Sequence, residues 1–223
     1  MATSRSSRAR REAVPADSYH HGALHAALID AAEAILRDGG IEAFSLREAA
    51  RRAGVSHAAP AHHFGDARGL LSACAATGFD RIADAMQRGV ERAGDDAADR
   101  LRAVGLAYID FALRNRALFQ LMFRRDRLDP QQAELVRAGK RTGDVLREAI
   151  AALMTSRRLP AAERAQRILL AWSVVHGYAT LVIENQCADL FGLDVERAKA
   201  AGRMGDELLR LVMSGLAQPA AGA

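Results

Sequence analysis

The sequence of 223 residues predicts an all-α protein. Its apolar residues recur three and four positions apart, the spacing of one face of an α-helix. No stretch alternates between apolar and polar residues as a half-buried strand does. The length suits one small and one larger helical domain with a proper core. We therefore expect an N-terminal three-helix domain followed by a larger C-terminal helical bundle domain.

The bulk properties are those of a soluble globular protein. Half of the residues are apolar, the net charge is +4 and the isoelectric point is about 9.6, a mild preference for polyanions. Cys74 and Cys187 are too few for a disulfide framework or a zinc site, which fits the reducing cytoplasm. The longest apolar run, 169–183, is short for a membrane span and is better explained as a buried helix.

The two ends of the chain have the composition of disordered segments. Residues 1–18 contain four arginines up to Arg11, with serine and alanine between them, and are expected to form a disordered basic arm. Such an arm either contacts DNA phosphates or stays a solvated tail, and the sequence leaves both open. Residues 217–223 are expected to fray. The basic start has no apolar core segment, so it predicts no signal peptide.

The run Ser45–Phe64 contains two short helices. The apolar face of the first consists of Leu46, Ala49, Ala50 and Ala53. Gly54 supplies the left-handed residue that ends this helix. Two short helices joined by a Gly-Val turn form the helix-turn-helix pattern, whose second helix enters a major groove of DNA. An ordinary helical corner in an all-α protein has the same spacing. The neighbouring sequence is therefore needed to distinguish a helix-turn-helix from such a corner.

Capping residues mark where both helices begin. Ser45 caps the first helix, and Glu48 three residues later completes a capping box. Ser56 is expected to cap the second helix. Side chains just after Ser56 are then the ones best placed to reach base edges or phosphates.

The residues before this motif identify its context. Leu24, Leu28, Ala31 and Ile35 form a core stripe that ends at Gly39 and Gly40. The whole run from Tyr19 to Leu71 resembles the DNA-binding domain of TetR-family transcriptional regulators, with Phe64 as the family's aromatic plug. The resemblance implies a DNA-binding domain over residues 19–66.

Two positions depart from the family's pattern. The family usually has tyrosine in place of Ala61 and lysine in place of Ala67, and both contact phosphates. His63 still matches the family's histidine, and Arg68 is a substitute for the missing lysine. The expected DNA contacts are Arg47, Ser56, His57, Ala58, His62, His63 and Arg68.

The C-terminal domain is expected to span residues 67–216. Its helical segments are predicted at 66–93, 101–111, 131–156, a stretch opened by Pro160, and 194–213, and residues 118–123 add a dense apolar cluster. Trp172 and His176 lie one helical turn apart, and Gly177 allows a close helix crossing. This signature and the segment RALFQLMF resemble the WHG-type ligand-binding domain of a TetR subgroup, although Arg116 stands where the family usually has proline.

This second resemblance implies a ligand pocket and a homodimer formed by the last two helices. The expected pocket residues are Met86, Tyr108, Phe119, Met122, Phe123, Trp172 and His176. The expected dimer residues are Gly177, Leu181, Leu208, Leu209 and Val212. Plain core packing is the alternative for each pocket residue, and burial within one chain is the alternative to a dimer.

Taken together, the sequence predicts a ligand-responsive DNA-binding regulator. The expectation is a dimeric repressor that binds a palindromic operator and is released by a small apolar effector. No phosphate-cradling glycine loop, Gly-x-Ser-x-Gly motif or apolar carboxylate pair is present, so no enzyme, cofactor or catalytic residue is predicted. His21 and His25 lack a completing ligand for metal. A degenerate family member that binds ligands or partners without DNA is the alternative.

Overall fold

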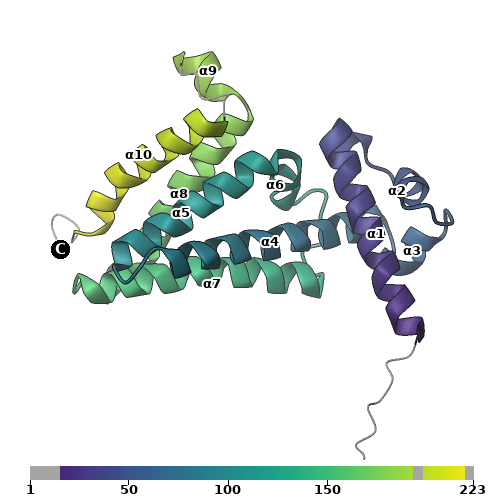
Figure 1. Ribbon diagram of the computed structural model, residues 1–223, viewed down its shortest axis with the longest axis horizontal. Coiled ribbons are helices and arrows are strands. Elements are labelled where there is room, and N and C mark those ends of the chain that lie inside the picture. Colours follow the sequence, from purple (N-terminus) through teal and green to yellow (C-terminus); the bar gives the residue numbers. More distant parts are fainter. Residues whose placement is uncertain (1–15, 193–197, 219–223) are drawn as a thin grey trace, which may run out of the picture.

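The computed structural model describes residues 16–192 and 198–218, and within them it contains ten α-helices and no strand. This confirms the predicted all-α class. Figure 1 shows a small group of helices at one end and a longer bundle extending away from it. The predicted arm up to residue 15 and the tail from residue 219 lie outside the described residues.

The small domain consists of α1 (Ala16–Gly39), α2 (Leu46–Ala53) and α3 (Ala59–Phe64), with a 3-10 turn at Ile41–Ala43. The first helix begins three residues before the predicted start at Tyr19. Its predicted core stripe is confirmed, because Leu28 and Ile35 are almost completely buried. These side chains hold α1 against α2 and α4.

The caps of α2 are largely as predicted. The Ser45 hydroxyl accepts the N–H of Glu48 at 3.2 Å, and Gly54 is left-handed with φ 69°. The capping box is only half formed, since the Glu48 carboxylate accepts hydrogen bonds from Arg51 and Arg52 instead. The Glu48 carboxylate binds the two arginines because hydrogen bonds between charged groups are stronger than a hydrogen bond to a backbone N–H.

The predicted cap of the second helix is wrong. The carbonyl of Ser56 accepts the N–H of Ala59 in a turn, and α3 begins at Ala59 without a side-chain cap. Pro60 occupies the first turn of α3. A proline is favoured there because its missing N–H would have had no helical partner. The proline therefore sets the helix start three residues after Ser56.

The long helix α4 (Ala67–Arg92) connects the two domains. Asp66 caps it by accepting the N–H of Gly69 at 2.9 Å. The residues predicted to face inward are all buried: Leu71, Ala75, Gly78, Ile82 and Met86. Three helices pack along it, α5 (Ala97–Arg114), α6 (Arg116–Met122) and α7 (Ala133–Ser156).

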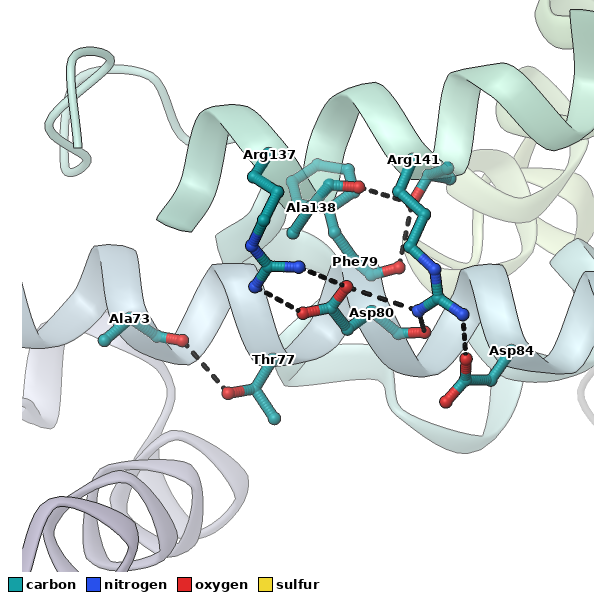
Figure 2. A network of polar contacts seen from close by, with 9 residues as sticks. Ala73, Thr77, Phe79, Asp80, Asp84, Arg137, Ala138 and Arg141 are labelled. Carbon is teal, nitrogen blue, oxygen red and sulfur yellow. Dashed lines mark hydrogen bonds and ion pairs between the residues drawn. The ribbon is translucent and has the colours of Figure 1, made fainter. Parts of the chain in front are cut away.

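A polar network fixes α7 against α4, as Figure 2 shows. Asp80 of α4 accepts from Arg137 at 3.0 Å and from Arg141 at 3.3 Å. Arg141 also pairs with Asp84, and the hydroxyl of Thr142 donates to the carbonyl of Phe79 at 2.8 Å. These contacts set the register of two helices that line the cavity described below.

The chain ends with α8 (Arg164–Ile183), α9 (Gln186–Phe191) and α10 (Ala198–Leu216). Pro160 precedes a 3-10 turn, so α8 starts slightly later than predicted. The short α9 was not predicted, and the expected start of the last helix at Asp194 lies outside the described residues. Arg167 joins α8 to the end of α10: it is buried and donates to the carbonyls of Leu216 and Gln218.

The expectation that 169–183 is a buried helix is only partly correct. Val175, Ala179 and Val182 are buried, but Leu169 is 60% and Trp172 is 43% exposed. No other part of the described chain covers this side of α8. The helix therefore has one face in the core and a second apolar face in solvent.

Candidate functional site

The helix-turn-helix presents a face of short side chains to solvent. Ser56, His57, Ala58, Ala61 and His62 are all exposed along the turn and α3. His63 is half-buried beside Phe64, whose ring packs 4.7 Å from that of His25. The structure thus brings the five exposed residues to one surface and keeps Phe64 as a hydrophobic contact between α3 and α1.

The arginines near this face differ in whether their charge is already bound to a group of the same chain. Glu48 pairs with Arg51 and Arg52 at 2.7 and 2.8 Å, and these bonds lower the pKa of Glu48 to about 2. Within the described residues Arg47 is exposed and has no ion-pair partner. Arg68, in the first turn of α4, is directed toward the chain between α6 and α7, where its guanidinium donates to the carbonyl of Leu128 at 2.5 Å. Arg47 is therefore the cation of α2 best placed for a polyanion.

An apolar cavity of about 260 Å³, here named the inner cavity, lies inside the C-terminal domain. Four of the seven expected pocket residues line it: Met86, Tyr108, Phe123 and Trp172. Met122 does not, because it packs on α4, with its sulfur 2.7 Å from where a Cβ at Gly78 would lie. For Met122 core packing is the better explanation.

Sequence reasoning missed a large part of the inner cavity's wall. Gly139 and Gly143 of α7 line it, and a Cβ at Gly139 would meet nothing within 4 Å. Leu209, Val212, Met213 and Leu216 of α10 close another side. Glycines add no apolar signal to a helical pattern, so only the spacing of Gly139 and Gly143, one turn apart, could have indicated a hollow there.

The polar groups beside the inner cavity bind one another. The hydroxyl of Tyr108 lies 2.9 Å from Nδ1 of His176. Burial raises the pKa of Tyr108, and a hydrogen bond from Trp172 acts in the opposite direction. His176 of the Trp-His signature on α8 thus holds one tyrosine of α5. The cavity is left with a wall that favours an apolar occupant.

His176 should make stability depend on pH. Burial lowers its pKa below the ordinary value of about 6.5. The unfolded chain then binds more protons than the folded one near pH 6, so the contribution of neutral His176 is present above about pH 6.5 and is lost as the pH falls. Urea unfolding from pH 7.5 to 5 should show the wild type losing more stability than His176→Gln. Parallel losses would contradict this.

A second cavity of about 310 Å³, the junction cavity, lies where the two domains meet. Gly40 and Ile41 of the small domain line it, and Phe119, His176 and Thr180 line it from α6 and α8. The expected pocket residues Phe119 and His176 therefore belong here. Only Phe123 among the expected residues lines both cavities.

The chain between α6 and α7, residues 123–132, is named the connecting segment. It begins at Phe123 in the cavity wall and continues along the small domain. Arg127 pairs with Glu42 at 2.7 Å, the carbonyl of the buried Leu128 accepts from Arg68, and the N–H of Asp129 donates to Ser72 at 2.8 Å. The segment thus links the cavity wall to the helix-turn-helix end of the molecule.

The residues expected at a dimer interface divide into two groups. Leu181 is 36% exposed, and Gly177 and Leu208 are half-buried. Leu209 is 6% exposed and Val212 is half-buried, and both face the inner cavity of their own chain. This corrects the expectation for Leu209, which offers almost no surface to a partner.

Other classes of site find little support in the described residues. Among them no group of three histidine, cysteine or acidic side chains is placed to hold a metal ion. Cys74 is buried, and burial raises the pKa of its thiol. None of the described helices is both long enough and apolar enough to cross a membrane.

An exposed helix-turn-helix joined by one long helix to a larger helical bundle is the architecture of a DNA-binding regulator. Residues 28–74 match the family model for bacterial regulatory proteins of the tetR family, and residues 101–214 match that for the tetracyclin repressor-like C-terminal domain. The chain belongs to the TetR family of transcriptional regulators.

Solved structures agree with this assignment. A protein with unknown function from Rhodococcus sp. RHA1 is 35% identical, with a TM-score of 0.71, 90% of this chain covered and 98% of the other. The TetR-family regulator PfmR from Thermus thermophilus is 19% identical, with a TM-score of 0.59 and coverages of 88% and 96%. A TetR-family regulator from Marinobacter aquaeolei is 18% identical, with a TM-score of 0.57 and coverages of 86% and 97%. No curated protein matched.

Proposed function

We propose that the protein is a homodimeric repressor that leaves a palindromic operator when a small apolar effector fills the inner cavity. The observation that carries this proposal is the connection between the two ends of the molecule. The small domain that carries the exposed helix-turn-helix continues directly into α4, which also lines the inner cavity. The connecting segment joins the same two regions a second time, through the ion pair between Arg127 and Glu42. A ligand that changes the cavity wall therefore acts on the DNA-binding end.

The exposed apolar face of α8 and α10 supports a dimer. Leu170 is 46% exposed, Leu181 36%, Met204 38% and Leu211 75%. Met204, Leu208 and Leu211 follow helical spacing on one side of α10, which packs beside α8. Large apolar side chains that gather on an exposed surface often mark an interaction site, and a two-fold copy of the chain would bury these.

In the proposed dimer, the distance between the two small domains determines which sites on DNA they can contact together. Their α3 helices would enter successive major grooves, roughly 34–36 Å apart. Ser56, His57 and His62 are exposed, and we expect them to contact bases and phosphates, with Arg47 on a phosphate. Ala61 and Ala67 bring no phosphate contact of their own, so affinity rests on few side chains at each half-site.

Filling the inner cavity is the direct test of effector release. In Gly139→Leu the new side chain enters the cavity, because nothing lies within 4 Å of its Cβ. Binding of the neutral probe N-phenyl-1-naphthylamine should weaken by about 5- to 150-fold, the effect of overpacking by about 1–3 kcal/mol. Release of bound DNA should correspondingly require a higher concentration of the probe. Trp172 is the only tryptophan and lines this cavity, so quenching of its emission measures occupancy.

Gly139→Ala is the matched control, since one methyl group leaves most of the cavity open. It should bind the probe nearly as the wild type does. Equal probe binding by Gly139→Leu and the wild type would contradict the assignment of the effector to the inner cavity.

A further inference from the structure

One aromatic layer separates the inner cavity from the junction cavity. Phe123 lines both, and its ring lies 4.4 Å from that of His176. Tyr108 on the inner side bonds to His176, which lines the junction side, at 2.9 Å. The two spaces are therefore neighbours with a wall one side chain thick.

The two cavities offer different chemistry to a ligand. In the inner cavity the hydroxyl of Thr142 already donates to the carbonyl of Phe79, Tyr108 is bonded to His176, and Arg147 is paired with Asp144 at its rim. An occupant there is held by apolar contact. In the junction cavity the Gln120 amide and the Thr180 hydroxyl have no hydrogen-bond partner within the described chain.

The charges around the junction cavity disfavour an anionic group. The guanidinium of Arg124 makes two bonds of 2.9 Å to the carboxylate of Asp126. Glu184 stands exposed at the cavity and is bonded only to the amide of Gln186. With the cation already neutralised and an acid nearby, the hydrogen-bonding groups that remain suit an uncharged polar head.

The sizes favour one ligand over two. Ligand sites usually enclose about 300–1,000 Å³. The inner cavity alone, at about 260 Å³, falls below that range, and the two cavities together fall well within it. Rotation of Phe123 would open one continuous channel from the apolar interior to the domain junction.

We infer that the effector is an elongated, uncharged amphipath whose apolar chain fills the inner cavity and whose polar head reaches Thr180 and Gln120 in the junction cavity. This inference rests on the effector-binding function proposed above. Because Gly40 and Ile41 belong to the DNA-binding domain, the head group touches both domains at once. The ligand then acts on the small domain by direct contact as well as through α4.

A series of 1-alkanols from hexanol to dodecanol, titrated into the full-length protein and followed by Trp172 emission, tests this inference. Affinity should rise by about fourfold per methylene. Once the chain is long enough for the hydroxyl to reach the junction cavity, Thr180→Val should weaken binding by about two- to twelvefold, the loss of one hydrogen bond. Hexanol binding should be the same in both proteins, and decanol should bind more tightly than decanoate.

Thr155→Val is the matched control, because Thr155 is exposed on α7 and lines neither cavity. Equal binding of every alkanol by Thr180→Val and Thr155→Val would overturn the inference, and so would tighter binding of decanoate than of decanol. Neither result would contradict the proposal that an effector binds in the inner cavity. If no alkanol alters Trp172 emission or releases DNA, the inference and the proposed effector function fall together.

Discussion

Replacing Gly69 with alanine is expected to abolish specific DNA binding. A Cβ at this position would lie 1.9 Å from the backbone carbonyl oxygen of Phe64, the last residue of α3. A backbone atom cannot rotate away as a side chain can, so the end of α3 and the start of α4 have to separate. The cost should be about 1–3 kcal/mol or more in the free energy of unfolding, with α3 displaced from its place on α1 and α4.

Thermal unfolding by circular dichroism and fluorescence anisotropy with duplex DNA measure the two effects of this substitution. Gly139→Ala is the control, because the same change inside α7 meets no atom and should stabilise the protein by about 0.5–1 kcal/mol. Wild-type affinity and stability in Gly69→Ala would show that the turn between α3 and α4 is not held as tightly as described.

Gly177→Leu should dissociate the dimer without unfolding the monomer. No atom of the described residues lies within 4 Å of a Cβ at Gly177, so we expect a new side chain there to meet a partner. Overpacking costs about 1–3 kcal/mol, and a two-fold interface contains the position twice. The dimer dissociation constant should therefore rise by about 30-fold to 10⁴-fold.

Sedimentation equilibrium at micromolar concentration measures this constant. Gly139→Leu introduces the same side chain away from the proposed interface and should remain dimeric. A wild-type protein that is itself monomeric at micromolar concentration, or a Gly177→Leu protein that dimerises as tightly as the wild type, would contradict the proposed interface.

The helices could be predicted because burial in this chain follows local periodicity. The stripes of α1 and α4 and the cap at Ser45 depend on residues a few positions apart, so the sequence contains all the information they need. The capping propensity of Ser56 alone predicts a helix start at that residue. The proline four residues later moves the start of α3 to Ala59. The short α9 was missed because six residues are too few to show a helical period.

The site could be predicted only where an apolar or aromatic side chain marks it. Tyr108, Phe123 and Trp172 were found, whereas Gly139 forms the cavity by having no side chain. Leu209 was assigned to the wrong side of α10, because a helix with two apolar faces does not indicate which of them faces its own chain. The tie between Arg68 and Leu128 joins residues sixty positions apart, and no local pattern predicts such a contact.

Selection of bound duplexes from a pool of random DNA sequences by the purified full-length protein tests the central claim most directly. If the protein is a dimeric operator-binding regulator, the enriched sequences should contain an inverted repeat whose half-sites lie about one helical turn, roughly 34–36 Å, apart. Binding to that sequence should weaken steeply with salt, by about 0.9 in log K per phosphate contacted for each unit of log salt concentration. If no sequence is enriched above the random pool, the exposed helix-turn-helix does not read DNA, and the alternative of a ligand-binding or interaction module without DNA binding replaces the regulator proposed above.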